Sequence, residues 1–242
     1  MNTVVVLPTY NEAGTIVAAL EQLSALSLPL EVLVVDDMSP DGTGDLVRRY
    51  IAESGTDRVS LLERPGQRGL GQAYRDGFSR VLAADRYDVV VQVDADGSHP
   101  FGRITEMVEL LAAGAGLVIG SRYCPGGTLT NDWPVGRRLL SRAANVYTKA
   151  MLGLPVADTT SGYRAWRTGV LRRVLENRPS QAEGYVFMVQ MLKGALCEGA
   201  EVKEIPIAFG QRIAGVSKLT AGIAIEGIWT CLVMRFSPGK VP

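Results

Sequence analysis

The chain has little of what would indicate disulfide bonds, a zinc site or a nucleic-acid partner. Its 242 residues include one histidine and three cysteines, Cys124, Cys197 and Cys231, without Cys-x-x-Cys spacing. We therefore expect free thiols in a reducing compartment. Lysine plus arginine total 25, as do aspartate plus glutamate. This balance argues against a general attraction to nucleic acid, so an anionic ligand must meet a local basic cluster.

Long apolar segments are also absent. The N-terminus, MNTVVVLPTY, has no basic region and no long apolar region before Pro8, so we interpret it as a first strand rather than a signal peptide. No run reaches the roughly 18 to 20 apolar residues of a membrane span. The closest segment, LTAGIAIEGIWTCLVM, carries Glu226 in its middle. We therefore expect a cytoplasmic protein that does not cross a bilayer by itself.

What the sequence does contain is a regular alternation of short apolar runs and helical patterns. With 47% hydrophobic residues, a chain of this length can bury a large core. Strands are predicted at 3–7, 31–36, 58–63, 88–94 and 116–120, and helices at 12–26, 44–53, 69–84 and 103–113. Short Val, Ile and Leu runs separated by helices indicate an α/β fold, a mostly parallel sheet with helices on both faces.

The alternation ends after residue 120. A loop rich in glycine and proline, CPGGTLTNDWP, leads into a basic helical segment, PVGRRLLSRAANVYTKAML. DTTSGYRAWR, two helical patterns and a strand within EVKEIPIAF follow. The C-terminal segment has an apolar stripe at helical spacing. The stripe consists of Ile225, Ile228, Trp229, Leu232, Val233 and Phe236.

Polar motifs follow the predicted strands: PTYNE, DDMSPDGT, RPGQRGLG, DADGSHP and GSRYCPGG. Because ligands of open parallel sheets bind beyond the carboxyl ends of the strands, we predict a binding cleft at this edge. The first turn, PTYNEAG, lacks Gly-x-Gly-x-x-Gly, which argues against a dinucleotide site in this cleft. We interpret Gly66, Gly69 and Gly71 as a turn and a helix start, with direct ligand contact as the alternative.

Asp94 and Asp96 end an apolar run and point to a metal. Residues i and i+2 of an extended segment project to the same side, and two close carboxylates are costly without a cation. Hard oxygen ligands with open positions suit Mg²⁺ or Mn²⁺ held jointly with substrate phosphates. The alternative is one aspartate that caps the next helix and one that is solvated. Asp36, Asp37 and Arg122, which converge on the same edge, favour the metal site.

The ordered motifs PTYNE, VVDDMSPDGT, VDADGSHP, GSRY, SGYRA and QRIAGVSK resemble family 2 glycosyltransferases of the nucleotide-diphospho-sugar transferase (GT-A, Rossmann-like) fold. Within that family the chain is most similar to dolichol-phosphate or polyprenol-phosphate mannose synthases, from residue 3 to about residue 220. The resemblance implies a catalytic domain at 1–220 and a C-terminal helix and tail at 221–242. Residues 1–122 would form the nucleotide-binding half and residues 123–220 the acceptor-binding half.

The resemblance also implies an activity and the residues that carry it. The activity is inverting transfer of mannose from GDP-mannose to a polyprenyl phosphate, with Mg²⁺ or Mn²⁺. Positions that match the donor-binding set are Pro8, Tyr10, Glu12, Val35, Asp37, Asp94, Ala95, Asp96, Arg122, Arg212 and Lys218. The last three match cationic positions that contact the donor diphosphate or the acceptor phosphate. Asp94, Asp96 and Arg122 match catalytic positions, and Arg137 and Ser141 match positions proposed to receive the acceptor phosphate.

The implied metal ligand is Asp96, the second aspartate of the DxD-type motif. Ser98 stands where the family often has a glutamine as a further ligand. Its hydroxyl is a shorter and weaker ligand, so we expect water to complete the coordination shell.

The chemistry agrees with these roles. A metal and Arg or Lys donors stabilise the charge on a departing diphosphate. A lipid monophosphate is already anionic and needs no general base. His99 therefore need not be catalytic, and we interpret it as a packing residue before Pro100, with support of the metal site as the alternative.

A lipid acceptor requires contact with a membrane. Arg137, Arg138, Arg142 and Lys149 alternate with apolar residues, which is typical of a helix that lies in a membrane interface. An amphipathic core helix with a solvated basic face is the alternative. For the C-terminal stripe three contacts stay open: the bilayer, the domain itself, or a separate membrane-spanning partner. We expect peripheral attachment to the cytoplasmic face of a membrane.

Two other functions stay open. Within the enzyme class, a UDP-glucose-dependent transferase would act on the same kind of lipid. Outside it, a degenerate module would only bind a membrane partner. A nucleotidyltransferase shares the fold but is expected to have a Gly-rich, basic loop after the first strand, which PTYNEAG is not.

Overall fold

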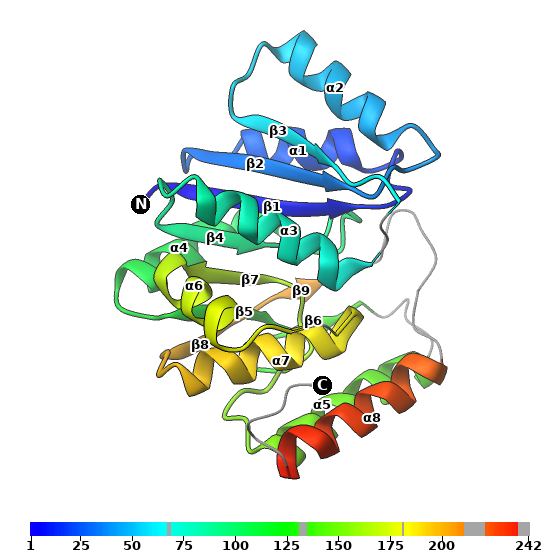
Figure 1. Cartoon of the computed structure of the whole chain (residues 1–242), viewed down its shortest axis with the longest axis vertical. Coiled ribbons are helices and arrows are strands. Elements are labelled where there is room, and N and C mark those ends of the chain that lie inside the picture. The colour runs from blue at the N-terminus through cyan, green and yellow to red at the C-terminus, as the bar shows by residue number, and fades with distance from the viewer. Residues whose placement is uncertain (67–68, 131–134, 181, 211–220, 237–242) are drawn as a thin grey trace.

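A sheet with the strand order β3-β2-β1-β4-β7-β5-β8 forms the centre of the computed structural model of this chain (Figure 1). The structure describes residues 1–66, 69–130, 135–180, 182–210 and 221–236. Neighbouring strands in the sheet run parallel, except that β7 is antiparallel to both β4 and β5. The expected mostly parallel α/β fold is confirmed.

The bounds of the elements are as follows. The strands of the large sheet are β1 (Thr3–Thr9), β2 (Leu30–Asp36), β3 (Val59–Glu63), β4 (Val89–Gln92), β5 (Leu117–Ser121), β7 (Arg164–Arg167) and β8 (Val202–Pro206); β6 (Thr128–Leu129) and β9 (Ala208–Phe209) form a small parallel pair. The helices are α1 (Ile16–Ser24), α2 (Thr43–Ser54), α3 (Leu70–Ala83), η1 (Phe101–Arg103), α4 (Ile104–Ala112), α5 (Val135–Leu152), α6 (Thr168–Asn177), α7 (Gly184–Cys197) and α8 (Ala221–Phe236).

Two differences from the predicted elements affect the site. β4 ends at Gln92, so the predicted strand at 88–94 extends two residues too far at its C-terminal end, and Asp94 lies in the loop beyond β4. The sequence also contains a strand that we did not predict, β7, inside the segment DTTSGYRAWR. With four residues, two of them arginines, this strand lacks the Val, Ile and Leu run that revealed the others.

Helices cover both faces of the sheet, which explains why β1 is buried along its whole length. Val5 and Leu7 belong to the core cluster that includes residues of α1, α2 and α4. Val4 and Val6 belong to the other cluster, with residues of α3, α6 and α7, the helices in front of the sheet in Figure 1. The sheet is therefore rigidly held from both sides, and its edges carry the loops.

α5 and α8 lie side by side, below the sheet in Figure 1. α8 packs on the domain through buried Cys231 and Met234, and the ammonium of Lys193 on α7 donates to the Met234 carbonyl at 2.8 Å. Trp229 and Phe236, by contrast, are 65% and 75% exposed. The buried residues of α8 thus lie beside the predicted stripe, whose described members are exposed or half-buried. The side chains of its other members, Ile225 and Ile228, lie outside the part that the structure describes, whereas Leu232 and Val233 are half-buried.

No described helix combines the length and the apolar character that crossing a bilayer requires.

The close contact of α3 with the sheet depends on a glycine. A Cβ added to Gly77 would lie 2.5 Å from Cγ1 of Val6 on β1 and 3.1 Å from Cγ2 of Val35 on β2. Both valines are buried in the sheet and have no room to withdraw.

We predict that Gly77→Ala lowers the free energy of unfolding by about 1–3 kcal/mol, because the added methyl overpacks the contact between α3 and the sheet. Urea unfolding measures the change. The control is Gly169→Ala in α6, where the nearest atom to an added Cβ is Nη1 of Arg173 at 3.8 Å. This control should keep or gain stability, by up to about 1 kcal/mol. Equal stability of the two variants would contradict the packing argument.

Candidate active site

The loop after β4 brings together Asp94, Asp96 and Ser98. Oδ1 of Asp94 accepts a hydrogen bond from the Tyr74 hydroxyl at 3.1 Å, and its side chain is 25% exposed. Asp96 is buried, and its Oδ1 accepts hydrogen bonds from the backbone N–H of Ser98, at 3.0 Å, and from the Ser98 hydroxyl. Gly97 permits this tight turn, with a φ of 77°. In this arrangement the Ser98 hydroxyl orients the Asp96 carboxylate.

Tyr74 on α3 is a contact of this loop that sequence reasoning missed. Burial raises the pKa of Tyr74 well above its ordinary value, and the charge of Asp94, its hydrogen bond and the charge of Asp96 add to the effect. Both carboxylates therefore lie near one phenol, which stays protonated and donates to Asp94. Nothing in the residue type or spacing of Tyr74 marked it, since an aromatic residue in an amphipathic helix usually packs in the core, as its ring does against Phe78 and Phe187.

At the end of β2, Asp36 and Asp37 are both buried but have different contacts. Asp36 accepts hydrogen bonds from the Thr9 hydroxyl at 2.8 Å and from the backbone and hydroxyl of Ser39 at 2.8 and 2.6 Å. It thereby holds the ends of β1 and β2 together. Asp37 forms an ion pair with Arg64 at 3.0 Å and accepts the N–H of Gly69 at 3.1 Å. Asp37 therefore sits where the end of β2 meets the start of α3.

The remaining donor-binding candidates of the first half lie at the same edge. Pro8 and Val35 are register partners in the β1–β2 pair and are buried. Tyr10 and Glu12 follow β1 directly and are half-buried. The carboxylate of Glu12 accepts the Thr15 hydroxyl at 3.1 Å. Ala95, between the two aspartates of the loop, is buried.

Glu183 occupies the N-terminus of α3. Its carboxylate accepts the N–H groups of Gly71 and Gln72 at 2.7 and 3.1 Å and pairs with Arg75 at 2.9 Å. A Cβ added to Gly69 would lie 2.7 Å from Glu183 Oε2, and one added to Gly71 would lie 2.4 Å from the Ala182 carbonyl. Gly69 and Gly71 thus lie at the helix start, as we interpreted them. They also permit the close contact with residues 182 and 183. The anion position at this helix end is filled by a side chain of the protein itself.

Arg122 follows β5 and is held by a buried carboxylate. Its Nε and Nη2 donate to the two oxygens of Asp158, each at 2.7 Å, and Nη2 also donates to the Thr160 hydroxyl at 2.8 Å. Burial opposes the charge of Arg122, but the charge and hydrogen bonds of Asp158 outweigh it and raise the pKa of Arg122. Burial would raise the pKa of Asp158, but Arg122 lowers it below the ordinary value. Both groups are therefore charged at neutral pH.

A second arginine, Arg164, lies beside this pair and was not predicted as a site residue. It is fully buried at the start of β7, and its guanidinium donates to the carbonyls of Thr159, Ser161 and Met188 at 3.0, 2.9 and 2.6 Å. Burial lowers the pKa of Arg164 to about 10, so it still carries a charge at neutral pH. Arg164 is the arginine of the motif SGYRA, so the sequence offered a signal for it. The motif alone did not indicate what this arginine does.

The predicted acceptor residues lie on α5. Ser141 is half-buried, and its hydroxyl forms a hydrogen bond of 2.7 Å with the hydroxyl of Tyr123, the residue after Arg122. Arg137 is half-buried one turn before Ser141. The structure therefore brings Ser141 to the end of β5. Arg212 and Lys218 lie outside the described residues.

His99 packs in the loop after β4. Its ring is 5.1 Å from that of Tyr163 and 5.0 Å from that of Phe209, and it is 5% exposed. Its Nε2 lies 3.5 Å from Oδ2 of Asp94. His99 is therefore a packing residue, as we interpreted it. It also lies beside Asp94, the carboxylate that it would support in the alternative interpretation.

The carboxylate oxygens at this edge of the sheet suit a divalent metal that also binds substrate phosphates. Within the described part of the chain no group of three or more His, Cys, Asp and Glu side chains is placed to hold a metal ion. Two carboxylates near one point supply hard oxygen ligands and leave positions for phosphate oxygens and water, as Mg²⁺ requires. Asp94 and Asp96 therefore suit a metal that arrives with a diphosphate.

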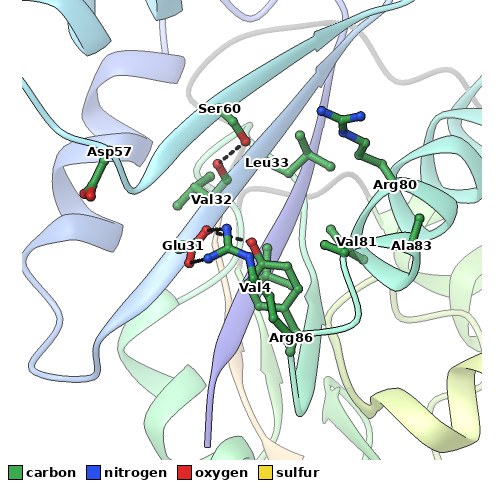
Figure 2. A pocket seen from close by; sticks show the side chains of 12 residues that line it. Val4, Glu31, Val32, Leu33, Asp57, Ser60, Arg80, Val81, Ala83 and Arg86 are labelled. Atoms are coloured by element: carbon green, nitrogen blue, oxygen red, sulfur yellow. Dashed lines mark hydrogen bonds and ion pairs between the residues drawn. The ribbon is translucent and has the colours of Figure 1, made fainter.

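The hollow drawn in Figure 2, of about 350 Å³, lies elsewhere, where the strands begin. Glu31, Val32, Leu33 and Ser60 of the starts of β2 and β3 line it, together with the end of α3. Its Arg86 pairs with Glu31 at 2.5 Å. Ligands of parallel sheets bind at the other edge, so we do not assign this hollow to the active site.

Two solved glycosyltransferase-type structures share the fold of this chain, which is the GT-A fold. Glucosyl-3-phosphoglycerate synthase from Mycobacterium tuberculosis, in complex with Mn²⁺, UDP and glucosyl-3-phosphoglycerate, matches with a TM-score of 0.67 and 22% identity, over 97% of this chain and 79% of that chain. A mannosyltransferase from Pyrobaculum calidifontis, in complex with GDP-Man and Mn²⁺, matches with a TM-score of 0.61 and 23% identity, over 100% of this chain and 66% of that chain.

The chain belongs to glycosyl transferase family 2, whose sequence profile matches residues 4–175. It is 41% identical to a polyprenol monophosphomannose synthase of Mycolicibacterium smegmatis, over 94% of this chain and 84% of the relative. It is 40% identical to an undecaprenyl-phosphate mannosyltransferase of Micrococcus luteus, over 94% of this chain and 91% of the relative.

We predict that Asp158→Asn lowers the free energy of unfolding at pH 7 by about 3–5 kcal/mol, because it leaves the buried charge of Arg122 unpaired. The pKa of Asp158 is lowered in the folded protein, so its stabilisation is present above the unfolded value near 3.8 and is lost as pH falls through the folded value. The variant should therefore lose less stability on acidification. Urea unfolding between pH 3 and 7 measures both effects.

The matched control is Asp85→Asn, which breaks the surface pair of Arg172 and Asp85, where the Asp85 side chain is 83% exposed. Its cost should stay below about 1 kcal/mol. Similar losses in the two variants would show that the Arg122–Asp158 pair is not the buried interaction described above.

Proposed function

We propose that this protein transfers mannose from GDP-mannose to a polyprenyl monophosphate, with inversion, giving polyprenyl-phosphate β-mannose and GDP. The two relatives at 40–41% identity support the mannosyl group and the polyprenyl phosphate. The observation that carries the proposal is the meeting, at one sheet edge, of the Asp94–Asp96 loop, Arg122 and Ser141 of α5.

The donor would bind across the ends of β1, β2 and β4, in the half formed by residues 1–122. Pro8, Tyr10, Glu12, Val35 and Asp37 would hold the guanosine. Their positions at the ends of the first two strands support this role. GDP-Man in the Pyrobaculum mannosyltransferase is consistent with the choice of donor. Ala95 would contact the donor from the loop after β4, and Arg212 and Lys218 would contact its diphosphate.

Asp94 and Asp96 would hold Mg²⁺ or Mn²⁺, with Asp96 as the principal ligand. When bound, the metal neutralises charge on the departing diphosphate. We assign Ser98 to orienting Asp96 rather than to the metal, because its hydroxyl already donates to that carboxylate. Water would complete the coordination shell, as we expect from the sequence.

The acceptor would bind in the half formed by residues 123–220, with its phosphate near Arg122, Arg137 and Ser141. A phosphate monoester is anionic at neutral pH, so the reaction needs no general base. Arg122 stays charged because Asp158 holds it, and it is placed to stabilise phosphate charge. No proton transfer to His99 is required.

The lipid would reach the site along α5 and α8. Leu139 and Val146 of α5 are 64% and 63% exposed, and Trp229 of α8 is 65% exposed. Exposed Arg142 and Lys149 lie on the same helix, α5. Apolar side chains with basic neighbours favour an interface that carries anionic lipids, so we propose peripheral binding to such a surface, with residues 221–242 contributing α8.

A purified sample tests the activity directly. We expect transfer of labelled mannose from GDP-mannose to polyprenyl phosphate, and loss of transfer when a chelator removes the divalent metal. Labelled UDP-glucose on the same lipid extract should give no more than about a tenth of this rate. Faster transfer from UDP-glucose would show that the protein is the glucosyltransferase. Absence of both transfer and metal-dependent nucleotide-sugar binding would show that it is a module that only binds a membrane partner.

In the same assay, Asp96→Asn should lower the transfer rate roughly 100-fold or more, because it removes the charge of the proposed metal ligand. The matched control is Asp45→Asn, an aspartate on α2 whose side chain is 74% exposed. This control should transfer at the wild-type rate. Full activity of Asp96→Asn with metal present would refute the role of Asp96.

We also predict that Val146→Glu and Trp229→Glu each weaken binding to anionic vesicles at least about tenfold, since a buried apolar side chain is worth about 1.5–3 kcal/mol. Co-sedimentation measures the binding. Ala52→Glu, at an exposed position of α2, adds the same charge on another helix and should bind like the wild type. An equal loss of vesicle binding in all three variants would show that net charge, and not this surface, determines the binding.

A further inference from the structure

Asn145 is a buried polar residue of α5 to which the proposed function gives no role. It is 3% exposed, and its amide is fully engaged. Oδ1 accepts the backbone N–H of Thr159 at 2.8 Å and the hydroxyl of Thr159 at 3.0 Å. Nδ2 donates to the Ser141 carbonyl and to the Thr160 hydroxyl, both at 3.0 Å. Because a buried amide is costly to leave unsatisfied, these bonds favour one position of α5 against the 159–160 loop.

The Thr160 hydroxyl carries this connection to Arg122. Its oxygen accepts both Nδ2 of Asn145, at 3.0 Å, and Nη2 of Arg122, at 2.8 Å. The loop itself is fixed to β8, because Glu204 accepts the backbone N–H groups of residues 157 and 158 at 2.7 and 2.9 Å. Asn145 is therefore two hydrogen bonds away from the guanidinium of Arg122.

A second route from Asn145 leads to the same place. Asn145 bonds the carbonyl of Ser141, and the Ser141 hydroxyl meets the hydroxyl of Tyr123. Tyr123 is the chain neighbour of Arg122, whose guanidinium lies 5.3 Å from the centre of the Tyr123 ring. Asn145, Thr160, Arg122, Tyr123 and Ser141 thus form a closed ring of contacts between α5 and the end of β5.

We propose that Asn145 is a positioning residue that sets the distance between Ser141 on α5 and Arg122 on the sheet, so that both meet the acceptor phosphate together. The inference rests on the proposed function, which assigns that phosphate to these two residues. Asn145 acts through Thr160 and Ser141 and does not itself contact substrate. In this way α5, which we propose to lie on a lipid surface, keeps a fixed position relative to the guanidinium of Arg122.

Kinetics of Asn145→Asp test the role. This change keeps the shape and the acceptor toward Thr159 but removes the two donors of Nδ2. We expect kcat/KM for polyprenyl phosphate to fall at least about tenfold, the loss that one misplaced charged contact causes. The Kd of GDP with Mg²⁺, measured by calorimetry, should stay within about twofold. The bonds of the Asn145 side chain go to residues 141, 159 and 160, and not to the residues of β1, β2 and the loop after β4 that we propose to hold the guanosine and the metal. Equal losses in both quantities would overturn the proposal in favour of general destabilisation.

Thr148→Val is the matched control. Its hydroxyl also joins α5 to the loop, through the Thr159 hydroxyl at 2.5 Å, but makes no contact with Thr160. We expect its acceptor kcat/KM to stay within about threefold of the wild type. A loss as large as that of Asn145→Asp would assign the effect to α5 packing in general and overturn the specific role of Asn145.

A double-mutant cycle tests the route through Thr160. Thr160→Val removes the hydroxyl that Asn145 and Arg122 share. In that background Asn145→Asp should lower the acceptor kcat/KM by less than about threefold, because the connection is already broken. Fully additive losses would overturn this route.

Amide hydrogen exchange tests the connection without reference to activity. Asn145→Ala should speed exchange about tenfold or more in 157–161 and 121–123 as well as in α5, and Thr148→Val should not. Faster exchange confined to α5 would overturn the connection. Faster exchange in all three segments with unchanged acceptor kinetics would overturn the positioning role alone. A wild-type protein that transfers nothing to polyprenyl phosphate would refute the proposed function, and exchange would still decide whether Asn145 fixes the loop.

Discussion

The candidate site depends on one strand that runs against the others. β7 lies between β4 and β5 and is antiparallel to both, so it begins at the edge where they end. Arg164, its first residue, is the register partner of Gln92 on β4 and of Ile119 on β5. The segment before β7 therefore has to pass between the Asp94–Asp96 loop and Arg122. An additional parallel strand would have begun at the opposite edge and brought none of these residues here.

Residues of that segment connect the two sides of the site. The Ser161 hydroxyl donates to the Gly120 carbonyl of β5 at 2.6 Å, and the Tyr163 hydroxyl donates to the Pro100 carbonyl at 3.0 Å. A Cβ at Gly162 would lie 3.7 Å from Oδ2 of Asp94, so the backbone passes close to that carboxylate. Asp158 fixes Arg122 from the same segment. This short stretch of chain thus joins the two sides of the site and fixes Arg122, whereas Tyr74 and Ser98 hold the two aspartates.

Sequence reasoning found the parts of the fold whose signal is local. β1, β2 and β5 are mostly buried apolar runs between helices, and such runs are recognisable without tertiary information. β7 is recognisable only through its neighbours, because it is short and its two arginines donate to backbone carbonyls outside the strand: Arg167, for example, donates to the carbonyls of Leu111 and Ala115. The same reason hid Tyr74, Asp158 and Glu183. Each acts on a residue far away in the sequence, and residue type alone does not reveal the partner.

The polar underside of α5 fixes the position of a helix whose opposite face is exposed. Apolar packing against the domain would bury the helix equally well, but apolar contacts are non-directional and tolerate a shift along the helix axis. A buried amide has fixed donor and acceptor directions, so a shift would break the three bonds of Asn145 to Thr159 and Thr160 at once. The outer face of α5 is free to be apolar and basic because the inner face already specifies its register. Contacts of the outer face can therefore vary without displacing Ser141 from Arg122.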